Sequence, residues 1–295
     1  MGIVATLRFV MRHPLNRGRK LGAAWRFLEW QLGSRLVPGP VIVGFVGTSR
    51  LIVTRGSTGA TGNLYTGLGE FEEMGFLGHF LRPGDLFVDI GANIGAYTIL
   101  AAGWIGADVI AVEPGPEAFE RLCENVRLNG VANRVQTRRV AIGEHEGAAM
   151  LTQNLDTMNH LIPAGDSESG MSVDVVTLDG LLRDSSPVAL KVDVEGFETA
   201  VFSRGEAVLA APQLQAMVVE MNGSGKRFGY DETSLHRTIL SHGFRHVRYD
   251  PVTRRIDAGD VQGAGDNRIY IRDSAELRSR LTSAPAIPLP FGRAL

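Results

Sequence analysis

One short stretch of the sequence contains an aspartate and two glycines at the spacing that is typical of a ligand-binding loop. Residues 87–98 read FVDIGANIGAYT, an apolar run followed by a glycine-punctuated turn and the start of a helical pattern. Gly91 and Gly95 lack a Cβ, so the backbone there can approach a ligand closely. Asp89 ends the predicted strand, at the edge where open α/β sheets bind their ligands.

A second carboxylate follows at a position that suits an adenosine ribose. Glu113 ends the next predicted strand, Val109–Val112, and lies eighteen residues after Gly95. A carboxylate in this place accepts hydrogen bonds from the two ribose hydroxyls. Charge-assisted bonds of this kind contribute about 1.5–3 kcal/mol each.

The loop departs from the dinucleotide fingerprint G-x-G-x-x-G at its middle glycine. Asn93 stands there, and its side chain obstructs the approach of a pyrophosphate. A ligand with adenosine but no phosphate fits better, and S-adenosylmethionine is the common one. Two alternatives stay open at this point: a nicotinamide-dependent oxidoreductase on the same fold, and a catalytically silent binding module.

The predicted cofactor site follows from these elements. Asp89 or a nearby group would meet the positively charged amino end of the donor, and the adenine ring would lie at the end of the third strand. The residues predicted to bind the cofactor are Asp89, Gly91, Asn93, Gly95, Tyr97, Thr98, Glu113, Pro114, Ala141, Ile142 and Asp193.

Acidic residues at the ends of two later strands are the candidates for catalysis. Asp193 and Glu195 stand at i and i+2 at the end of the predicted strand Val188–Val194, so their side chains should leave on one side. One of them could act as general base or orient the donor, or the pair could hold Mg²⁺ through oxygen ligands. Alternatively, Glu195 only begins the next helix, where a carboxylate favours the positive end of the dipole. Glu220 ends the following strand and Asn222 comes after it, so both are predicted to line the same cleft.

Three further candidates lie in polar or glycine-rich loops. His160, in the loop Asp156–His160, has the pKa of a general base near neutrality and should overhang the cleft. Tyr65 and Glu70 belong to a glycine-rich region, Gly56–Gly69 and its end, that is predicted to close over the donor or acceptor. The ordinary alternative is that all three are solvent-exposed loop residues.

The elements that must position these residues alternate between short apolar strands and helices. From Leu86–Ile90 onward this alternation predicts a Rossmann-like, doubly wound and mostly parallel sheet. Stretches Ala148–Gln153 and Ser172–Thr177 predict an inserted hairpin, and a strand is expected near Val135–Ile142. A single helix is expected over Ala200–Leu209, and Phe244–Tyr249 with Arg268–Ile271 predict closing antiparallel strands.

The first forty residues differ from the rest, with seven basic residues against Glu29 alone. Trp25, Leu28, Leu32 and Leu36 recur at helical spacing, which predicts a helix that packs on the main domain with its basic face in solvent. Contact with an anionic membrane surface or an acidic partner is the alternative. We expect an N-terminal helix and hairpin (1–60), a main domain (61–280) and a proline-rich, extended or disordered tail (281–295).

Composition excludes several classes of protein. The chain has 295 residues, 44% hydrophobic and 21% charged, with a net charge of −2, so neither wholesale disorder nor a nucleic-acid partner is indicated. The single cysteine excludes an intrachain disulfide framework and fits a reducing compartment, hence a cytoplasmic location. No apolar run approaches the roughly 20 residues of a membrane-spanning helix. A homo-oligomer is compatible with all of this.

Three ordered blocks resemble the FkbM-type S-adenosylmethionine-dependent methyltransferases. They are the stretch 87–98, the tetrapeptide AVEP at 111–114, and VTLD at 176–179 followed by KVDVEGFE at 191–198. The resemblance covers roughly residues 65–272. It implies a Rossmann-like fold and methyl transfer to oxygen, often to a hydroxyl of a sugar, cyclitol, glycan precursor or polyketide. Transfer to nitrogen or carbon stays open as a variant.

Overall fold

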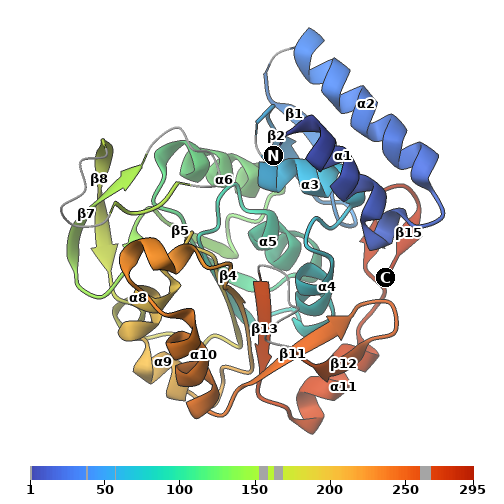
Figure 1. Cartoon of the computed structure of the whole chain (residues 1–295). Coiled ribbons are helices and arrows are strands. Elements are labelled where there is room, and N and C mark those ends of the chain that lie inside the picture. The colour runs from blue at the N-terminus through green and yellow to red at the C-terminus, as the bar shows by residue number, and fades with distance from the viewer. Residues whose placement is uncertain (1, 38, 57, 153–158, 163–168, 260–266) are drawn as a thin grey trace.

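One eight-stranded sheet forms the centre of the protein (Figure 1). The computed structural model describes residues 2–37, 39–56, 58–152, 159–162, 169–259 and 267–295. The strand order is β12-β11-β13-β10-β9-β3-β4-β5. Strands β5, β4, β3, β9 and β10 are parallel, and β13 lies antiparallel between β10 and β11. The strands are β3 (Leu86–Ile90), β4 (Asp108–Val112), β5 (Val135–Arg138), β9 (Ala189–Val192), β10 (Ala216–Glu220), β11 (Arg245–Asp250), β12 (Arg255–Ala258) and β13 (Asn267–Ile271).

Helices cover both faces of this sheet, because its central strands are apolar on both sides. The apolar residues of β4 alternate: Val109 and Ala111 pack into one core, while Ile110 and Val112 pack into the other. The first face carries α4 (Phe71–Phe80), α5 (Ala96–Ile99), the π-helical turn η2 (Leu100–Ile105), α6 (Pro116–Leu128) and α11 (Ala275–Ser283). The second face carries α7 (Leu178–Leu181), α8 (Glu198–Ser203), α9 (Glu206–Ala210) and α10 (Glu232–Ser241). The predicted Rossmann-like fold is confirmed, although the single helix expected over 200–209 is two short ones.

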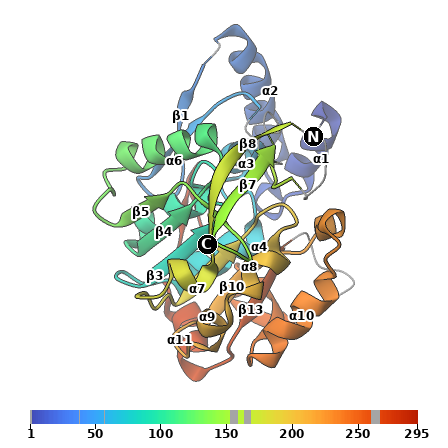
Figure 2. The ribbon, with the colours of Figure 1, turned by 90° about the vertical axis from the view of Figure 1, so that its left-hand side faces the viewer.

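A second, three-stranded sheet stands beside the main one (Figure 2). The predicted hairpin is present as β7 (Gly147–Thr152) and β8 (Gly170–Val176), paired antiparallel. The strand expected near 135–142 is in fact two strands, because β6 (Ala141–Ile142) leaves β5 and pairs with β8. In β6, Ala141 packs in a small apolar core with Leu151 and Val175.

The N-terminal region packs as a layer against the edge of the main domain (Figure 1). It consists of α1 (Ile3–Arg12), the short η1 (Pro14–Asn16), α2 (Lys20–Leu36), the predicted hairpin β1 (Val41–Gly44) and β2 (Arg50–Val53), and α3 (Thr58–Thr66). The prediction of a glycine-rich loop over 56–69 is wrong, because most of this segment forms α3. Burial of Ala60 and Tyr65 outweighs the poor helix propensity of the glycines.

The orientation of α2 also differs from the prediction. Trp25, Leu28, Leu32 and Leu36 were expected to pack on the main domain, and they are exposed instead. The helix packs through the opposite face, where Ala23, Phe27 and Trp30 are buried. The helical spacing of the leucines identified an apolar face correctly, but a helix with two apolar faces leaves the choice between them to tertiary packing.

The proline-rich tail is packed rather than extended or disordered. Ile287 and Leu289 are buried, and Ile287 exchanges two backbone hydrogen bonds with Leu295. The short strands β14 (Pro288–Leu289) and β15 (Arg293–Ala294) pair antiparallel, and Gly47 donates its N–H to the carbonyl of Pro288. Prolines alone predicted an unpaired tail, whereas two buried aliphatic residues anchor it. In the described part of the chain, no helix is long and apolar enough to cross a bilayer.

Candidate active site

A cavity of about 560 Å³ opens at the carboxyl ends of β3, β4, β9 and β10. The order of the strands reverses there, since β4 and β5 follow on one side of β3 while β9 and β10 lie on the other. Ligands of open α/β sheets bind at such a switch point. The N-terminal layer supplies the facing wall, through Thr6 and Phe9 of α1 and Tyr65 of α3.

The glycine loop after β3 is held in place by Glu113. Its two carboxylate oxygens accept hydrogen bonds from the backbone N–H groups of Asn93 (2.9 Å) and Gly115 (2.8 Å). Asn93 has a φ of +51°, in the left-handed region that asparagine tolerates better than most residues. Asn93 therefore allows the loop to adopt a left-handed backbone conformation at this position. Glu113 lines the cavity beside it.

Burial raises the pKa of Glu113 to about 7, although the two N–H donors act in the opposite direction. A positively charged or hydroxyl-bearing ligand would favour the ionised carboxylate, because only that form accepts at both oxygens. Glu113 thus lines the cavity at the end of β4, and its role in binding the ribose stays a prediction.

Asp89 lies beneath the loop rather than in the cavity. Its side chain is fully buried, and Thr98 donates a 2.7 Å hydrogen bond to Oδ2. The other oxygen, Oδ1, has no hydrogen-bond partner among the described residues. Burial raises the pKa of Asp89, and the charge of Lys191 opposes that rise.

Lys191 links Asp89 to the reacting side of the cavity. Its ammonium, with a side chain only 4% exposed, donates a 2.8 Å hydrogen bond to Asp193 and lies 5.0 Å from the centre of the Tyr97 ring. The hydroxyl of Tyr97 in turn donates to Glu70, which also accepts a bond of 3.1 Å from Asn267. These groups form one continuous polar network, and burial raises the pKa of Glu70 within it.

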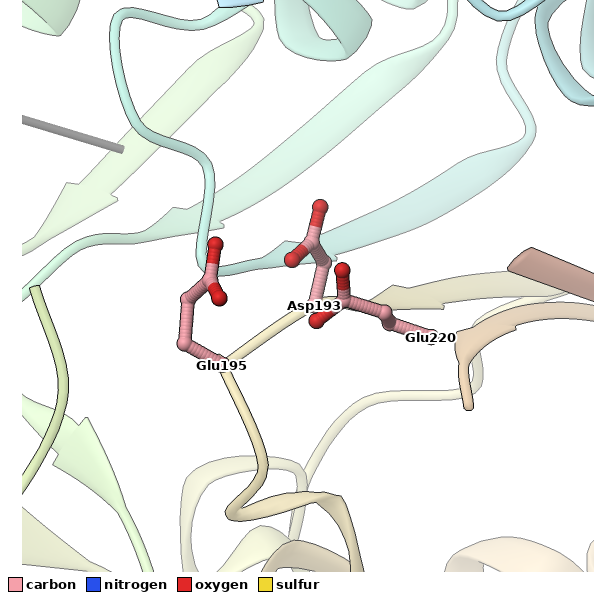
Figure 3. Close-up of side chains that lie close together, drawn as sticks. All are labelled: Asp193, Glu195 and Glu220. Carbon is pink, nitrogen blue, oxygen red and sulfur yellow. The ribbon is translucent and has the colours of Figure 1, made fainter. Parts of the chain in front are cut away.

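Three carboxyl groups converge at the ends of β9 and β10 (Figure 3). One oxygen each of Asp193, Glu195 and Glu220 lies within 4.8 Å of the others, and all three side chains are half-buried. Glu195 reaches this position through a turn with φ of +55°, not as the i+2 residue of a strand, because β9 ends at Val192. Burial, with the neighbouring Asp193, raises the pKa of Glu195 to about 7 and that of Glu220 further.

Most predicted site residues line this cavity. They are Tyr65, Glu70, Gly91, Asn93, Tyr97, Glu113, Pro114, Ala141, Ile142, His160, Asp193, Glu195 and Glu220. Asp89, Gly95 and Thr98 support the loop from behind, and Asn222 is exposed outside the cavity, where it accepts from the N–H of Ser224. The hydroxyl of Tyr65 is engaged by Gln31 of α2. Of the loop before His160, residues 156–158 lie outside the described residues.

The polar residues that line the cavity and escaped the sequence reasoning include Asn63, Glu73, Lys191 and Asn267. A signal existed for Lys191, because a lysine within the apolar strand Ala189–Val192 has to find a buried partner. Asn63 lies on the glycine-rich helix α3, Glu73 lies on α4 just before its buried residues Met74–Phe80, and Asn267 begins a strand at the far end of the chain. Only the folded arrangement brings these three to the site.

The fold is Rossmann-like, and its cavity lies at the carboxyl ends of the parallel strands. Residues 89–246 match the family described as "Methyltransferase FkbM domain". The chain belongs to this family and is a methyltransferase, which sets aside the oxidoreductase and the silent-module alternatives.

Two named relatives are similar over part of the chain. The 31-O-demethyl-FK506 methyltransferase FkbM of Streptomyces tacrolimicus is 34% identical over 206 residues, which cover 58% of this chain and 77% of that protein. The hexuronic acid methyltransferase AglP of Haloferax volcanii is 29% identical over 122 residues, or 40% of this chain and 48% of that one. Among solved structures, an rRNA methylase from Streptococcus thermophilus aligns with a TM-score of 0.41 at 12% identity, covering 68% of this chain and 93% of that one.

Proposed function

We propose that this methyltransferase moves the methyl group of S-adenosylmethionine to a hydroxyl group of a small polar molecule or glycan precursor. The observation that carries the proposal is the arrangement of one cavity, with Glu113 at its nucleoside side and the cluster of Asp193, Glu195 and Glu220 at its other side. A donor lying between them would present its methyl group toward the cluster.

The donor side offers contacts for each part of S-adenosylmethionine. Glu113 would accept from the ribose hydroxyls, and Ala141 and Ile142 supply apolar packing for the adenine ring. Asp193 would meet the positively charged amino end. Its partner Lys191 keeps the carboxylate in place from below, through the 2.8 Å hydrogen bond.

Methyl transfer requires that the protein aligns the donor with the acceptor and that the acceptor hydroxyl loses its proton. The carbon–sulfur bond of the sulfonium breaks as the oxygen–carbon bond forms, and the sulfur keeps the electron pair, so donor and acceptor must be held in line. Orientation of this kind is worth about 7–11 kcal/mol. The hydroxyl proton must also leave, and we propose that a carboxylate of the cluster takes it. Glu195, with its pKa raised to about 7, is matched to that task near neutral pH.

The charges of the cavity favour an acceptor without negative charge. Of the described residues that line it, six carry carboxyl groups, and Lys191 carries the one permanent positive charge, which Asp193 already engages. A neutral sugar, a cyclitol or an amine-bearing hydroxyl compound would be accepted more readily than a uronic acid. The acceptor class proposed here therefore differs in charge from the hexuronic acid named for the Haloferax volcanii relative.

The same three carboxylates would suit a hard divalent cation such as Mg²⁺, which prefers oxygen ligands. The buried Oε2 of Glu220, which has no hydrogen-bond partner among the described residues, is the observation that fits such a use. Asp193, Glu195 and Glu220 would be the ligands, and a bound cation would lower the pKa of an acceptor hydroxyl.

Calorimetric titration of the purified chain tests the donor assignment. We expect S-adenosylmethionine to bind and NAD(H), as the parallel control, not to bind. Glu195→Gln and Glu220→Gln should then lower the rate of methyl transfer at unchanged donor affinity. If only NAD(H) binds, the donor proposal fails.

A chelator separates the two roles of the cluster. Activity that survives exhaustive chelation supports a carboxylate base. Activity that is lost, and returns with added Mg²⁺, assigns the cluster to a cation.

A further inference from the structure

Helix α2 carries a second apolar face that nothing in the described part of the chain covers. Leu21, Trp25, Leu28, Leu32 and Leu36 are 90%, 67%, 50%, 61% and 80% exposed. At 3.6 residues per turn their side chains fall within about 80° of arc, so they form one stripe along the helix. We call these five residues the α2 stripe.

The α2 stripe is not a by-product of how the helix folds onto the protein. The inner face is already satisfied: Ala23, Phe27 and Trp30 are buried, and Phe27 packs against Tyr65 with ring centres 5.6 Å apart. Arg26 fixes the same face by donating to the carbonyl of Tyr65. A surface helix of a globular protein normally has one apolar face and one polar face. A contiguous exposed apolar strip marks an interaction surface.

Exposed apolar side chains are concentrated in this part of the molecule. Ile3 and Val4 of α1 are 56% and 73% exposed, and Val37 and Ile42, which follow α2, are also exposed. Elsewhere in the described residues, exposed large hydrophobic side chains occur singly, as with Val252. In Figure 1, α2 lies at the outer edge of the protein, beyond α1 and α3.

The N-terminal region that carries the α2 stripe is basic. Residues 1–40 carry seven arginines and lysines against Glu29, although the whole chain has a net charge of −2. All of the seven except Arg26 are exposed: Arg8, Arg12, Arg17, Arg19, Lys20 and Arg35. The charge of the protein is therefore polarised, with its positive end at the exposed apolar helix.

We infer that α2 and the start of α1 form a docking surface for an anionic lipid bilayer. A helix with an apolar stripe, an aromatic residue and basic flanks lies in the interface of a membrane, with leucines below the headgroups and basic groups among them. A second copy of the chain would bring like charges together around the α2 stripe. Nucleic acid would offer the leucines nothing to pack against.

The docking surface and the cavity share a helix. Ile3 and Val4 are exposed at one end of α1, and Thr6 and Phe9 of the same helix line the cavity. A chain bound through this surface would hold its cavity next to the bilayer. The docking inference itself does not depend on the proposed donor or acceptor.

Co-sedimentation of the full chain with lipid vesicles tests the inference. We expect binding to vesicles of phosphatidylcholine with phosphatidylglycerol, weak binding to phosphatidylcholine alone, and release at high salt. Trp25→Ser combined with Leu28→Ser should lower the partition coefficient about a hundredfold. Lys20→Gln and Arg35→Gln should each lower it about fivefold.

Matched controls separate docking from folding. Val252→Ser removes an equally exposed apolar residue, and Arg183→Gln removes an exposed arginine, both far along the chain from α2, and neither should change vesicle binding. Trp25→Phe should keep binding but lose most of the blue shift of tryptophan fluorescence on adding vesicles. Thermal unfolding and donor titration of every variant should match the unsubstituted chain.

Three results would overturn the inference. The first is failure of the unsubstituted chain to bind anionic vesicles. The second is equal binding to neutral and anionic vesicles. The third is a dimer in sedimentation velocity that Trp25→Ser with Leu28→Ser converts to monomer, which would assign the α2 stripe to a second copy of the chain.

Discussion

Asp89 and Lys191 are register partners on the adjacent parallel strands β3 and β9, and both are buried on the same face of the sheet. Two residues further along the chain, just after β9 ends, Asp193 accepts the hydrogen bond of the Lys191 ammonium at 2.8 Å. The carboxyl group beneath the glycine loop and the carboxyl group at the end of β9 are thus both close to one cation. The sheet itself connects the two halves of the site.

Replacement of Lys191 tests this connection. Lys191→Met removes the charge that lowers the pKa of Asp89 and Glu70, so both carboxyls should hold protons to higher pH. Breaking a buried pair costs about 3–5 kcal/mol, and urea unfolding should show a loss of that order. The acid limb of the pH–rate profile should therefore shift to higher pH. Lys226→Met, at an exposed lysine, is the control, and an unchanged profile in Lys191→Met would show that the ammonium only fills space.

Glu113→Gln should weaken S-adenosylmethionine binding by about 10- to 100-fold, because an amide can replace only one of the two charged acceptor oxygens. Calorimetric titration measures this directly. Glu117→Gln, at the exposed start of α6, should bind the donor normally. Equal affinities for the two variants would remove Glu113 from the donor site.

The stability of the ligand-free chain should fall as pH rises from about 6.5 to 8.5. An acid with a raised pKa binds more protons folded than unfolded, so its contribution is present at low pH and is lost as pH rises through the folded pKa. The groups concerned have an ordinary pKa of 4.5 and a raised pKa in the folded chain: Glu73 (about 8), Glu113, Glu195 and Glu198 (each about 7) and Glu220 (about 10).

The lower bound of this window is set by two buried histidines. The pKa values of His13 and His79 are lowered from 6.5 to about 4 by burial, so they destabilise the fold only below pH 6.5. Thermal unfolding at several pH values measures the effect, and Glu73→Gln should flatten the slope while Glu206→Gln, at an exposed carboxyl, should not. A midpoint that is constant or rises over this range would contradict the burial of these carboxyl groups.

Acceptor charge gives a fourth prediction, which rests on the proposed function. With labelled S-adenosylmethionine, glucose and glucosamine should be better acceptors or tighter ligands than glucuronate, which places a negative charge among six carboxyl groups. At pH 9, where Glu73 with its pKa of about 8 is ionised, Glu73→Gln should narrow the difference in rate between glucuronate and the other two acceptors. Preference for glucuronate would refute the proposed acceptor class while leaving the donor assignment intact.

The sequence predicted the cavity residues around the glycine loop better than those of the facing wall, for a physical reason. Gly91, Asn93 and Glu113 belong to one strand-turn-helix unit and the next strand, so local pattern and strand order place them together. The facing wall of the cavity instead combines Thr6, Glu73 and Asn267 from distant parts of the chain. No spacing rule relates such residues.

Packing decided the features that the pattern left ambiguous. The apolar spacing of α2 was recognised, but Phe27 and Trp30 on its opposite face made the contacts with the protein. Glycines at 56–69 predicted a loop, and burial of Ala60 made it a helix. In both cases the deciding partners lie outside the local window that a sequence pattern can describe.

Gly91 allows the loop after β3 to pass close to the backbone that follows β9. With φ at +75°, a Cβ at this position would lie 1.7 Å from the carbonyl oxygen of Asp193. The loop after β3 and the segment after β9 therefore pass backbone to backbone, with no room for a side chain between them. Any substitution at Gly91 has to displace one of these two segments, and with it part of the wall of the cavity.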